Sequence, residues 1–454
     1  MPTMSSHDAL VIGAGVSGLV AAEILAAAGR RVAVLEARDR VGGRTWTVDT
    51  ESGLRVDIGG QWLGPTQQRA HGLVQRLGLR TYPQFHDGAK CLQRDGRLSE
   101  YSGTIPALPF WGLIDLQLNL WRIDRRARRL TADSPWLADD AEALDRLSVE
   151  DWLKRHARSD PAREMIRLAT HAVFAQEPGR ISLLQFFSYV RNAGGLMDLL
   201  EIDGGAQQTR IAGGAQALST GLAERLSASG GELRLSTPVR GIEAGQDGVR
   251  VHTDNGALDA PRVIVAMAPA DAGRIDWRGS LHPRRRELFE RQPAGSAIKC
   301  IAIYDQPFWR ADGRSGELVS DDEPLRMSFD GSPPDTSRGA LVGFILGDAA
   351  RRWSERGPAA RREAVCAQLA TVFGPRAAEP IEYLDQDWCR EQWTGGCYTG
   401  LFAPGGMQEL APLLRAQDGR VHWAGTETAT RWTGYIDGAV EAGERAATEV
   451  LSAR

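Results

Sequence analysis

The chain has 454 residues, of which 42% are hydrophobic and 25% are charged, the composition of an ordinary globular protein. Its 54 Lys and Arg against 58 Asp and Glu leave a net charge of −4, so no global field favours nucleic acid or an anionic membrane. The five Cys form no C-x-x-C pair and the eight His form no H-x-x-x-H or H-x-E pattern. We therefore expect no metal site and no disulfide framework, and a reduced, cytoplasmic location.

Residues 9–29 are almost entirely small or apolar and resemble a targeting segment at first sight. Residues 1–8 lack the basic region that precedes a signal peptide. The stretch also contains four Gly and a Glu, and it barely reaches the roughly 20 residues that a membrane span requires. The spacing of its glycines indicates a different role.

Three elements follow one another at the start of the chain. The apolar run 9–12 predicts a strand, 19–28 predicts a helix of small residues that stops at Gly29, and 31–35 predicts a second strand. Gly13, Gly15 and Gly18 form G-x-G-x-x-G between the first strand and the helix. This order predicts a Rossmann-type dinucleotide-binding unit.

Each part of this unit has a physical task. Gly13 permits the tight turn, Gly15 lets the backbone approach a pyrophosphate, and Gly18 lets helix and strand pack closely. The helix N-terminus presents free N–H groups to the phosphates. Glu36 ends the second strand, 18 residues after Gly18, where an acid accepts hydrogen bonds from a ribose diol. An acid here disfavours the 2′-phosphate of NADP but leaves NAD and FAD open.

The next residues favour FAD. The run 38–44 reads Arg-Asp-Arg-Val-Gly-Gly-Arg, which supplies a second phosphate-approach loop and cations capable of bidentate contact. A long FAD clamp requires such a loop, whereas an NAD half-domain does not. Residues 8–44 resemble the signature of the flavin amine oxidase superfamily, which implies FAD as the cofactor.

Two further segments have the alternating strands and helices of an FAD-binding domain. Residues 206–269 predict a helix at 217–226 and strands at 233–236, 249–252 and 263–266. Residues 419–427 predict a strand, and 434–450 predict a helix. We expect an α/β protein with two discontinuous domains: an FAD domain of residues 1–85, 205–283 and 395–454, and an α+β substrate domain of residues 86–204 and 284–394. Helices at 113–130 and 139–157 belong to the second domain, and we expect the arginines at 122–129 to be a solvated helix face.

Two C-terminal motifs specify the chemistry. Residues 393–400 read Trp-Thr-Gly-Gly-Cys-Tyr-Thr-Gly, and residues 425–443 begin Gly-Thr-Glu-Thr-Ala-Thr. Both closely resemble the flavin-containing monoamine oxidase family, and the chain is similar to a soluble bacterial member. The likeness is weak across 86–200 and 311–384. It implies that an amine, O2 and water become an aldehyde, ammonia and hydrogen peroxide, with the flavin taking a hydride equivalent. Animal relatives continue into an apolar C-terminal helix, whereas this sequence ends at Arg454, so we expect no membrane partner.

The resemblance implies three catalytic residues and a covalent link. Tyr398 and Tyr435 match the two tyrosines that form a slot in front of the flavin, and their π faces favour the polarity of an amine. Lys299 lies in an apolar strand, where an ammonium is costly, and matches the lysine that acts through a water at flavin N5. Cys397 matches the cysteine that bonds to the flavin 8α-methyl as a thioether. A free buried cysteine is the alternative for Cys397.

Other matches assign the rest of the site. Trp388 resembles a tryptophan near the flavin, with a plain core residue as the alternative. Trp62 stands where animal enzymes carry Tyr, and either Gln207 or Gln208, with Gln207 favoured, matches a glutamine that orients the substrate. The residues expected to contact the cofactor are Gly13, Gly15, Gly18, Glu36, Arg38, Gly42, Gly43, Arg44, Gly60, Gln61, Trp62, Val239, Trp388, Cys397, Gly425, Glu427, Gly434, Tyr435 and Ile436. The expected substrate pocket comprises Trp62, His171, Phe174, Leu199, Gln207, Tyr304, Tyr398 and Tyr435.

Several alternatives stay open at this point. A diamine, polyamine or cyclic-amine oxidase, or an L-amino-acid oxidase, would share the chemistry but need different groups in the pocket. A flavin dehydrogenase would use an electron carrier instead of O2, and Lys299 argues against it. An FAD-bound scaffold without catalysis would not need Tyr398, Tyr435 and Lys299 together. The sequence names no substrate, and a homodimer is the default expectation for assembly.

Overall fold

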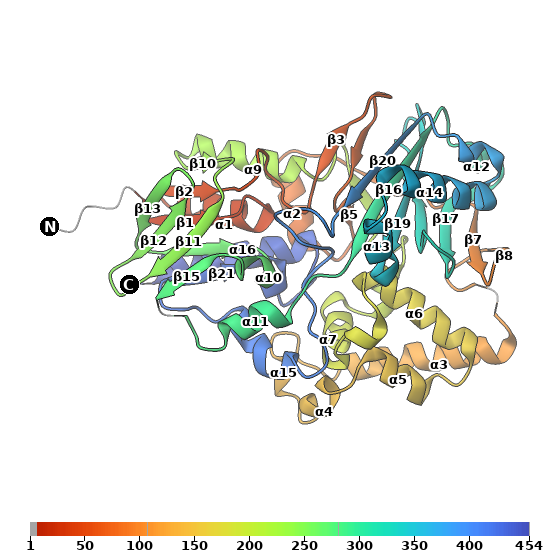
Figure 1. Ribbon diagram of the computed structural model, residues 1–454, viewed down its shortest axis with the longest axis horizontal. Coiled ribbons are helices and arrows are strands. Elements are labelled where there is room, and N and C mark those ends of the chain that lie inside the picture. The colour runs from red at the N-terminus through yellow and green to blue at the C-terminus, as the bar shows by residue number, and fades with distance from the viewer. Residues whose placement is uncertain (1–6, 107, 280, 454) are drawn as a thin grey trace.

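The computed structural model describes residues 7–106, 108–279 and 281–453. A five-stranded parallel sheet occupies the end of the molecule at the left of Figure 1. Its strand order is β10 (Glu232–Arg234), β2 (Val32–Leu35), β1 (Ala9–Ile12), β14 (Val263–Ala266) and β21 (Val421–Ala424). Three separate parts of the chain thus contribute to one sheet, and all of these strands were expected from the sequence.

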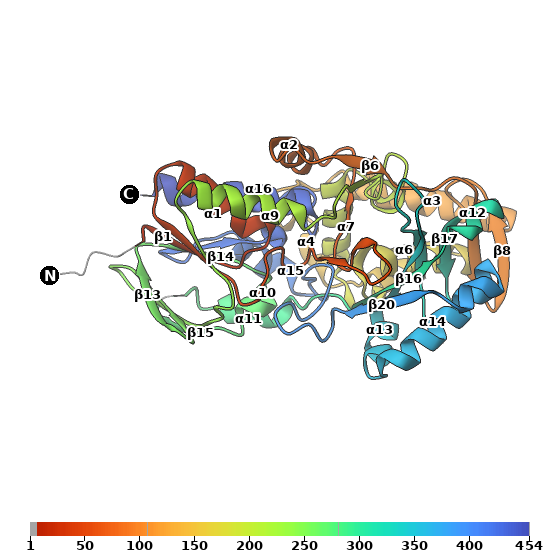
Figure 2. The same ribbon diagram turned by 90° about the horizontal axis from the view of Figure 1, so that it is seen from above.

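The side chains of β1 divide between two hydrophobic cores. Ala9 and Val11 face the helices α1 (Val16–Ala27), α9 (Ala217–Ala228) and α16 (Ile436–Ser452). Leu10 and Ile12 point the other way, toward a second sheet of β13 (Gly256–Ala260), β12 (Val249–Thr253), β11 (Val239–Ala244) and β15 (Asp276–Gly279). Both faces are covered, as a parallel sheet requires, and Figure 2 shows the helices and the second sheet on opposite sides.

A glycine sets the distance between the two long helices of this region. A Cβ at Gly443 would lie 2.4 Å from the Ser17 carbonyl oxygen, so α16 can approach α1 only without a side chain there. The third glycine of the fingerprint acts in the same way, because a Cβ at Gly18 would lie 2.0 Å from the Gly13 oxygen. Gly18 is therefore a packing residue, as expected from its place in the motif.

A seven-stranded sheet forms the other end of the molecule. Its order is β20 (Glu382–Asp387), β16 (Ala297–Tyr304), β19 (Gly339–Leu346), β18 (Met327–Asp330), β17 (Arg314–Ser320), β7 (Ala89–Arg94) and β8 (Arg97–Tyr101). All eight residues of β16 are buried. The odd-numbered Ala297, Ile301 and Ile303 belong to one core and the even-numbered Ile298 and Tyr304 to another, which follows from the two-residue period of a strand.

Helices cover this half from below in the view of Figure 1. They are α3 (Phe110–Ala127), α4 (Ala141–Asp145), α5 (Val149–His156), α6 (Asp160–Phe174), α7 (Leu183–Ala193) and α8 (Leu196–Leu200). The single helix expected at 139–157 was wrong, because two helices meet there. Ser148 begins α5 in a reciprocal capping box with Asp151, and a residue committed to an N-cap cannot continue the preceding helix.

The remaining elements connect these layers. The helices are α2 (Gln68–Arg76), α10 (Pro269–Ala272), α11 (Arg285–Arg291), α12 (Phe308–Ala311), α13 (Gly347–Ser354), α14 (Pro358–Phe373) and α15 (Met407–Leu410). The strands are β3 (Thr47–Asp49) with β4 (Arg55–Asp57), and β5 (Trp62–Leu63) with β9 (Thr209–Ile211) and β6 (Thr81–Pro83). Each sheet falls within one of the two domains proposed from the sequence, although the domain boundaries themselves stay a prediction.

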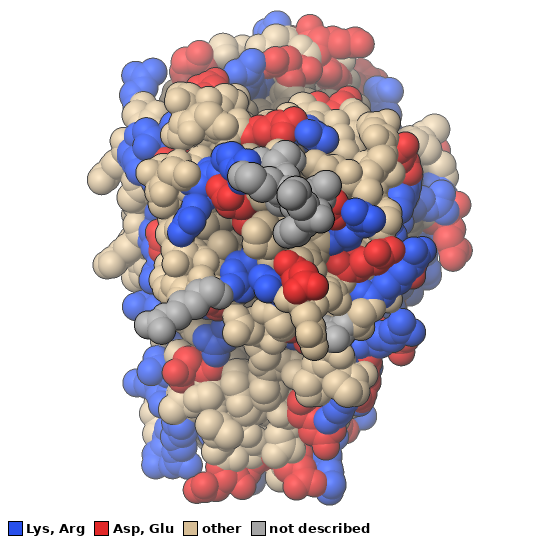
Figure 3. Space-filling model, turned by 90° about the vertical axis from the view of Figure 1, so that its left-hand side faces the viewer, with Lys and Arg blue, Asp and Glu red and all other residues tan. Residues whose placement is uncertain are grey.

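The surface charges, the cysteines and the helices of the described residues are as follows. At the end of the molecule seen in Figure 3, positive and negative residues are interspersed. The five cysteines are free. Within the described ranges no cluster of three His, Cys, Asp or Glu is arranged for a metal ion, and none of the helices is long and apolar enough to cross a membrane.

Candidate active site

A cavity of about 420 Å³ runs between the two halves of the molecule. Its lining comes from the carboxyl ends of β1, β2 and β14, from β16, from α7 and from the C-terminal motifs. All of the residues expected to contact a cofactor line this cavity except Gly18 and Glu427. The cavity lies where open α/β sheets bind nucleotides, outside the carboxyl ends of their strands.

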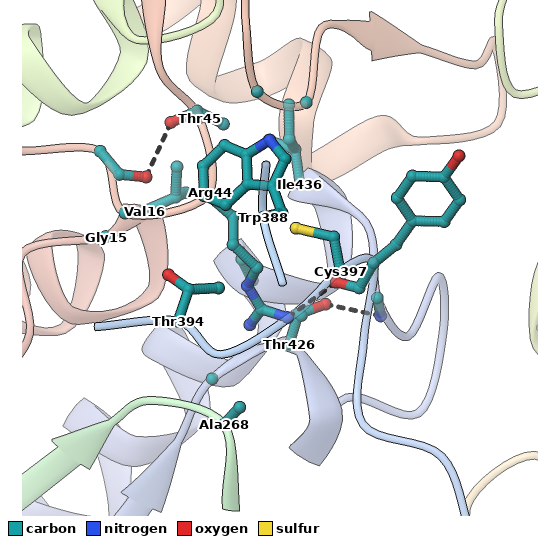
Figure 4. Close-up of a pocket in the computed structure, with 18 of the residues that line it drawn as sticks. Gly15, Val16, Arg44, Thr45, Ala268, Trp388, Thr394, Cys397, Thr426 and Ile436 are labelled. Carbon is teal, nitrogen blue, oxygen red and sulfur yellow. Dashed lines mark hydrogen bonds between the residues drawn. The ribbon is translucent and has the colours of Figure 1, made fainter. Parts of the chain in front are cut away.

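The glycine loop leaves room for a ligand. Gly13 has φ +99°, and a Cβ there would lie 2.8 Å from the Ala266 oxygen, so only glycine fits the turn. A Cβ at Gly15 would meet only the Gly42 oxygen, at 3.9 Å, so the backbone at Gly15 is open to the cavity. The next residue, Val16, begins α1 and lines the same cavity (Figure 4). The first N–H groups of a helix have no partner within the helix. The loop is therefore built to hold a phosphate group.

Glu36 is fixed at the end of β2 and is only 3% exposed. Its Oε2 accepts a hydrogen bond of 2.7 Å from the Ala14 N–H, and its Oε1 accepts one of 3.0 Å from the Arg38 N–H. Arg38 in turn donates to the Thr394 hydroxyl at 2.6 Å. Because each carboxylate oxygen has a second lone pair, Glu36 can still accept hydrogen bonds from a ribose diol.

Arg44 and Glu427 form an ion pair beside the cavity. Arg44 donates to both carboxylate oxygens of Glu427, at 2.6 and 3.1 Å, and to the Tyr398 carbonyl at 2.9 Å. Burial works against both charges, but the pairing outweighs it, so the pKa of Arg44 is raised and that of Glu427 is lowered. Glu427 does not line the cavity as expected. It holds Arg44 there instead, because its carboxylate is fully engaged by Arg44, Thr399 and the Gly400 N–H.

Cys397 and Trp388 lie on the same wall. Figure 4 shows the Cys397 sulfur pointing into the space beside Trp388 and Arg44. The Trp388 indole donates to the Ile58 carbonyl at 3.0 Å, which fixes its ring. Burial raises the pKa of the Cys397 thiol to about 12 although Arg44 opposes the shift. The protein alone therefore holds a thiol rather than a thiolate at this position at neutral pH.

Lys299 is buried at the centre of β16, 3% exposed, and its amine reaches the cavity. It donates to the Gly59 carbonyl at 2.8 Å and to the side-chain oxygen of Gln61. Burial lowers the pKa of Lys299 to about 7, although Asp57 opposes the shift. The Gln61 Nε2 is buried without a partner, so the lysine and glutamine together present hydrogen-bond donors to a ligand.

The two tyrosines are held by different layers of the molecule. The Tyr435 ring packs against Trp432 at 5.0 Å and Tyr189 at 6.2 Å, whereas the Tyr398 ring packs edge-on against Phe344 at 6.4 Å. Both rings line the cavity. Burial raises the pKa of both phenols, so they stay neutral at physiological pH. The two rings therefore border the cavity as uncharged aromatic groups.

The structure separates the two candidate glutamines. Gln207 lines the cavity beside Leu199, donates its Nε2 to the Leu199 carbonyl at 3.1 Å and has a buried Oε1 without a partner. Gln208 lies outside the lining, and its Oε1 accepts a hydrogen bond from the Gly204 N–H. Gln207 is thus the one that lines the cavity with an unpartnered acceptor.

Three residues expected in the substrate pocket lie outside its lining. Tyr304 projects from the opposite face of β16 to Lys299, an odd number of residues away, and its hydroxyl donates to the Ala377 carbonyl. Phe174 is packed between Phe186 and Tyr189, and His171 bonds to Glu177 at 2.9 Å. Their neighbours on α6, Ala172 and Val173, line the cavity instead.

Sequence reasoning missed other lining residues. Tyr189 and Phe344 support the tyrosine pair and come from parts of the chain in which no motif stands out. Asp271, on α10, also lines the cavity, 4.0 Å from Arg274, and burial raises the pKa of its carboxyl to about 7. A single acid in an otherwise ordinary helical turn gives no signal in the sequence.

Comparison with known proteins decides the family. Residues 16–451 match the family model described as flavin containing amine oxidoreductase. The chain belongs to that family. It is 38% identical to the "Probable flavin-containing monoamine oxidase A" of Dictyostelium discoideum, over 98% of this chain and 97% of the relative.

Solved structures agree with this assignment. A putrescine oxidase bound to putrescine superimposes with a TM-score of 0.94 and 32% identity, covering 98% of this chain and 99% of that one. The cyclohexylamine oxidase from Brevibacterium oxydans IH-35A superimposes with a TM-score of 0.92 and 32% identity, covering 98% of each chain. The expected fold class, family and cofactor are therefore confirmed, and the protein is an FAD-dependent amine oxidase.

The residues present fit FAD. The open backbone at Gly15 and the free N–H groups of α1 suit its pyrophosphate, and Glu36 suits its ribose. The unpartnered Nε2 of Gln61, next to Lys299, lies in the same cavity at the end lined by the tyrosines. The cavity thus has groups that suit a nucleotide at one end and the two tyrosines at the other.

Proposed function

We propose that the enzyme oxidises a primary or secondary monoamine that binds between Tyr398 and Tyr435. The observation that carries this proposal is that both rings, Lys299 and the free acceptor of Gln207 border one cavity with the FAD cradle. The bound cofactor supplies the redox chemistry by accepting a hydride equivalent from the carbon next to nitrogen and passing the electrons to O2. Every other contribution comes from side chains of this protein.

The pocket favours the reactive form of the substrate. An amine must be neutral when it is oxidised, and an apolar, aromatic environment lowers the pKa of its ammonium form by desolvation. Met327, Phe329 and Phe344 supply such surroundings. The Gln207 Oε1 can accept a hydrogen bond from the amine N–H and orient it toward the cofactor.

The charges in the pocket favour a monoamine over a diamine or an amino acid. Among the described lining residues, the carboxylates are Glu36 and Asp271, which lie with Arg38, Arg44 and Arg274 at the cofactor end. The wall that includes Leu199, Phe329 and Phe344 carries no acid for a second ammonium and no arginine for a carboxylate. A second charge on the substrate would stay unpaired there, at a cost.

Lys299 is proposed to assist the reaction with O2 through a water near the reactive ring of the cofactor. Its lowered pKa, its place in the cavity and its hydrogen bond to Gln61 support this role. Cys397 is proposed to form the thioether to the flavin, and its position on the cavity wall supports that assignment.

The proposal also covers the location of the protein and its assembly. We assign it to the cytoplasm because its five cysteines are free and buried or half-buried. We keep the homodimer as the expected assembly, since closed symmetric dimers are the commonest oligomers.

The substrate class is tested by peroxide release from a panel of amines. Benzylamine, tyramine, hexylamine and cyclohexylamine represent monoamines, putrescine represents diamines, and L-phenylalanine represents amino acids. We expect kcat/KM for the best monoamine to exceed that for putrescine and L-phenylalanine by at least about 100-fold. A factor of this size is the expected effect of burying one charged group of the substrate without a partner. Preferred turnover of putrescine would assign the enzyme to the diamines instead.

A further inference from the structure

Helix α3 has an apolar face that no part of the described structure covers. The exposed fractions of five of its side chains are 68% for Phe110, 75% for Trp111, 37% for Ile114, 46% for Leu118 and 51% for Trp121. A single exposed apolar residue is ordinary, but five large apolar side chains on one face of a helix form a contiguous patch of the kind that marks an interaction surface.

The patch lies opposite the face that packs on the protein. At about 100° per residue, its five members fall within a sector of roughly 100° of the helix. The buried residues lie in the opposite sector and are Gly112, Leu116, Asn119, Ile123 and Ala127. A helix that is apolar on both sides is normally covered on both sides, so the outer face of α3 is made for a second contact.

Basic side chains surround this patch. Arg122, Arg125, Arg128 and Arg129 continue the outer face at the C-terminal end of α3, where Arg125 stacks on Trp121 at 4.9 Å. Lys154, Arg155 and Arg158 lie at the end of α5. That end is joined to the side of α3 by a hydrogen bond from the Arg158 N–H to Asp115. In the described structure none of these seven basic groups has a carboxylate within 4 Å.

The acids of α3 do not balance these charges. Asp115 accepts hydrogen bonds from Ser159 and the Arg158 N–H, and Asp124 accepts one from the Leu196 N–H. Both carboxylates are therefore engaged with the protein. The acids on the neighbouring helices are also paired, Asp160 with Arg163 and Glu150 with Arg167, so the seven basic groups near the patch are an unbalanced excess of positive charge. At the opposite end of the molecule the two signs are interspersed (Figure 3).

We propose that α3 docks the enzyme on an anionic lipid bilayer, with the helix lying flat at the level of the head groups. The complementary charge decides between the possible occupants. A lipid surface offers phosphates to the arginines and an apolar boundary to Trp111 and Trp121, which is how interfacial helices bind. A second copy paired through α3 would bring its own seven unpaired basic groups against these seven, at a repulsive cost.

Docking through α3 needs no membrane-spanning segment, and the expectation of no membrane partner rested on the lack of one. Helix α3 has 18 residues and is too polar at its C-terminal end to cross a bilayer, but it has the length and the two-sided character to lie on one. It packs on α6, α7 and α8, which carry the cavity residues Val173, Tyr189 and Leu199. One layer of helices would thus separate the apolar end of the amine cavity from the lipid.

Vesicle flotation of the holoenzyme tests the proposal. We expect the protein to float with vesicles that contain 40% phosphatidylglycerol in phosphatidylcholine, not to float with pure phosphatidylcholine, and to be released by about 0.5 M NaCl because exposed charges are then screened. We expect the double variant W111Q/W121Q and the triple variant R125Q/R128Q/R129Q each to bind at least about tenfold more weakly.

Matched controls separate docking from unfolding and from general charge effects. I381Q removes an apolar side chain that is 48% exposed elsewhere, and R30Q/R286Q/R356Q removes three exposed arginines elsewhere. Both controls should bind as the wild type does, and W111Q/W121Q should keep the wild-type flavin spectrum and amine turnover in solution. The proposal is overturned if the wild type does not float with anionic vesicles, or if the controls lose as much binding as the α3 variants. It is also overturned if the wild type is a dimer that W111Q/W121Q converts to monomers without any vesicle binding.

Discussion

Lys299 in the middle of β16 donates a hydrogen bond to the side chain of Gln61, which lies 238 residues earlier in the loop before β5. This contact joins the seven-stranded sheet to the FAD cradle and directs one lysine amine into the cavity. Because burial lowers the pKa of this amine to about 7, it can exchange a proton near neutral pH without leaving its position. The relationship explains why a single lysine occurs in an otherwise apolar strand.

The first prediction concerns the role of Lys299 in the reaction with O2. In K299M we expect reoxidation of the reduced enzyme by O2 to slow at least about tenfold, because a positioned proton donor or acceptor contributes a factor of at least this size. Reduction by the amine should change less than about threefold. Stopped-flow absorbance measures the two half-reactions separately, and the exposed Lys154→Met is the control. An equal loss in both half-reactions would show a structural effect instead.

The same lysine predicts a pH dependence of stability. Between pH 7 and about 10, Lys299 is neutral in the folded protein but still protonated in the unfolded chain, whose lysine pKa is about 10.4. The unfolded state then binds more protons, so the free energy of unfolding should rise with pH across this window. Urea denaturation of the wild type and K299M at pH 7, 8 and 9 measures the difference, and an identical pH slope for both proteins would contradict it.

The two adjacent glutamines form a matched pair. Gln207→Leu should raise KM for the best monoamine about tenfold, the loss expected for one hydrogen bond in a buried site, whereas Gln208→Leu should leave KM unchanged. Steady-state peroxide release measures both variants. A larger effect for Gln208→Leu would show that the structural assignment of Gln207 is wrong.

Breaking the ion pair between Arg44 and Glu427 should lower the stability of the protein strongly. Glu427→Gln leaves a guanidinium without its counter-ion in a mostly buried place, and breaking such a pair costs about 3 kcal/mol. Asp49→Asn breaks the solvent-exposed pair with Arg55 and should change stability little. Chemical denaturation compares the two variants, and equal midpoints would contradict the proposed importance of burial.

The covalent link is tested on the denatured protein. If Cys397 bonds to the flavin, acid-precipitated enzyme stays yellow, and Cys397→Ala releases all of its FAD while still binding it in the native state. The Cys397 thiol has a pKa of about 12, so attachment would require removal of its proton within the assembled site. A colourless wild-type precipitate would show that the link does not form.

The nucleotide-binding part could be predicted closely from the sequence because its signals are local. The glycines at 13, 15 and 18 and the acid at 36 have tasks that depend on a few neighbouring residues, and the structure places them accordingly. The strands of this region follow from short apolar runs bounded by turns.

The substrate end could be predicted only in part, because it depends on packing between distant segments. Tyr304 was expected in the pocket, but the two-residue period of β16 puts it on the far face from Lys299. His171 and Phe174 lie on α6, the helix that borders the cavity, but Ala172 and Val173 are the residues of this helix that line it. Tyr189 and Asp271 reach the cavity through the tertiary fold alone, and no motif marks them.

An anaerobic titration of the purified enzyme with amines tests the central claim most directly. We predict that a monoamine such as benzylamine, tyramine, hexylamine or cyclohexylamine bleaches the absorbance band of the oxidised flavin. Admission of air should then restore the band with release of one hydrogen peroxide per flavin. If none of the amines bleaches the band while dithionite does, the account of a catalytic amine site between Tyr398 and Tyr435 is contradicted.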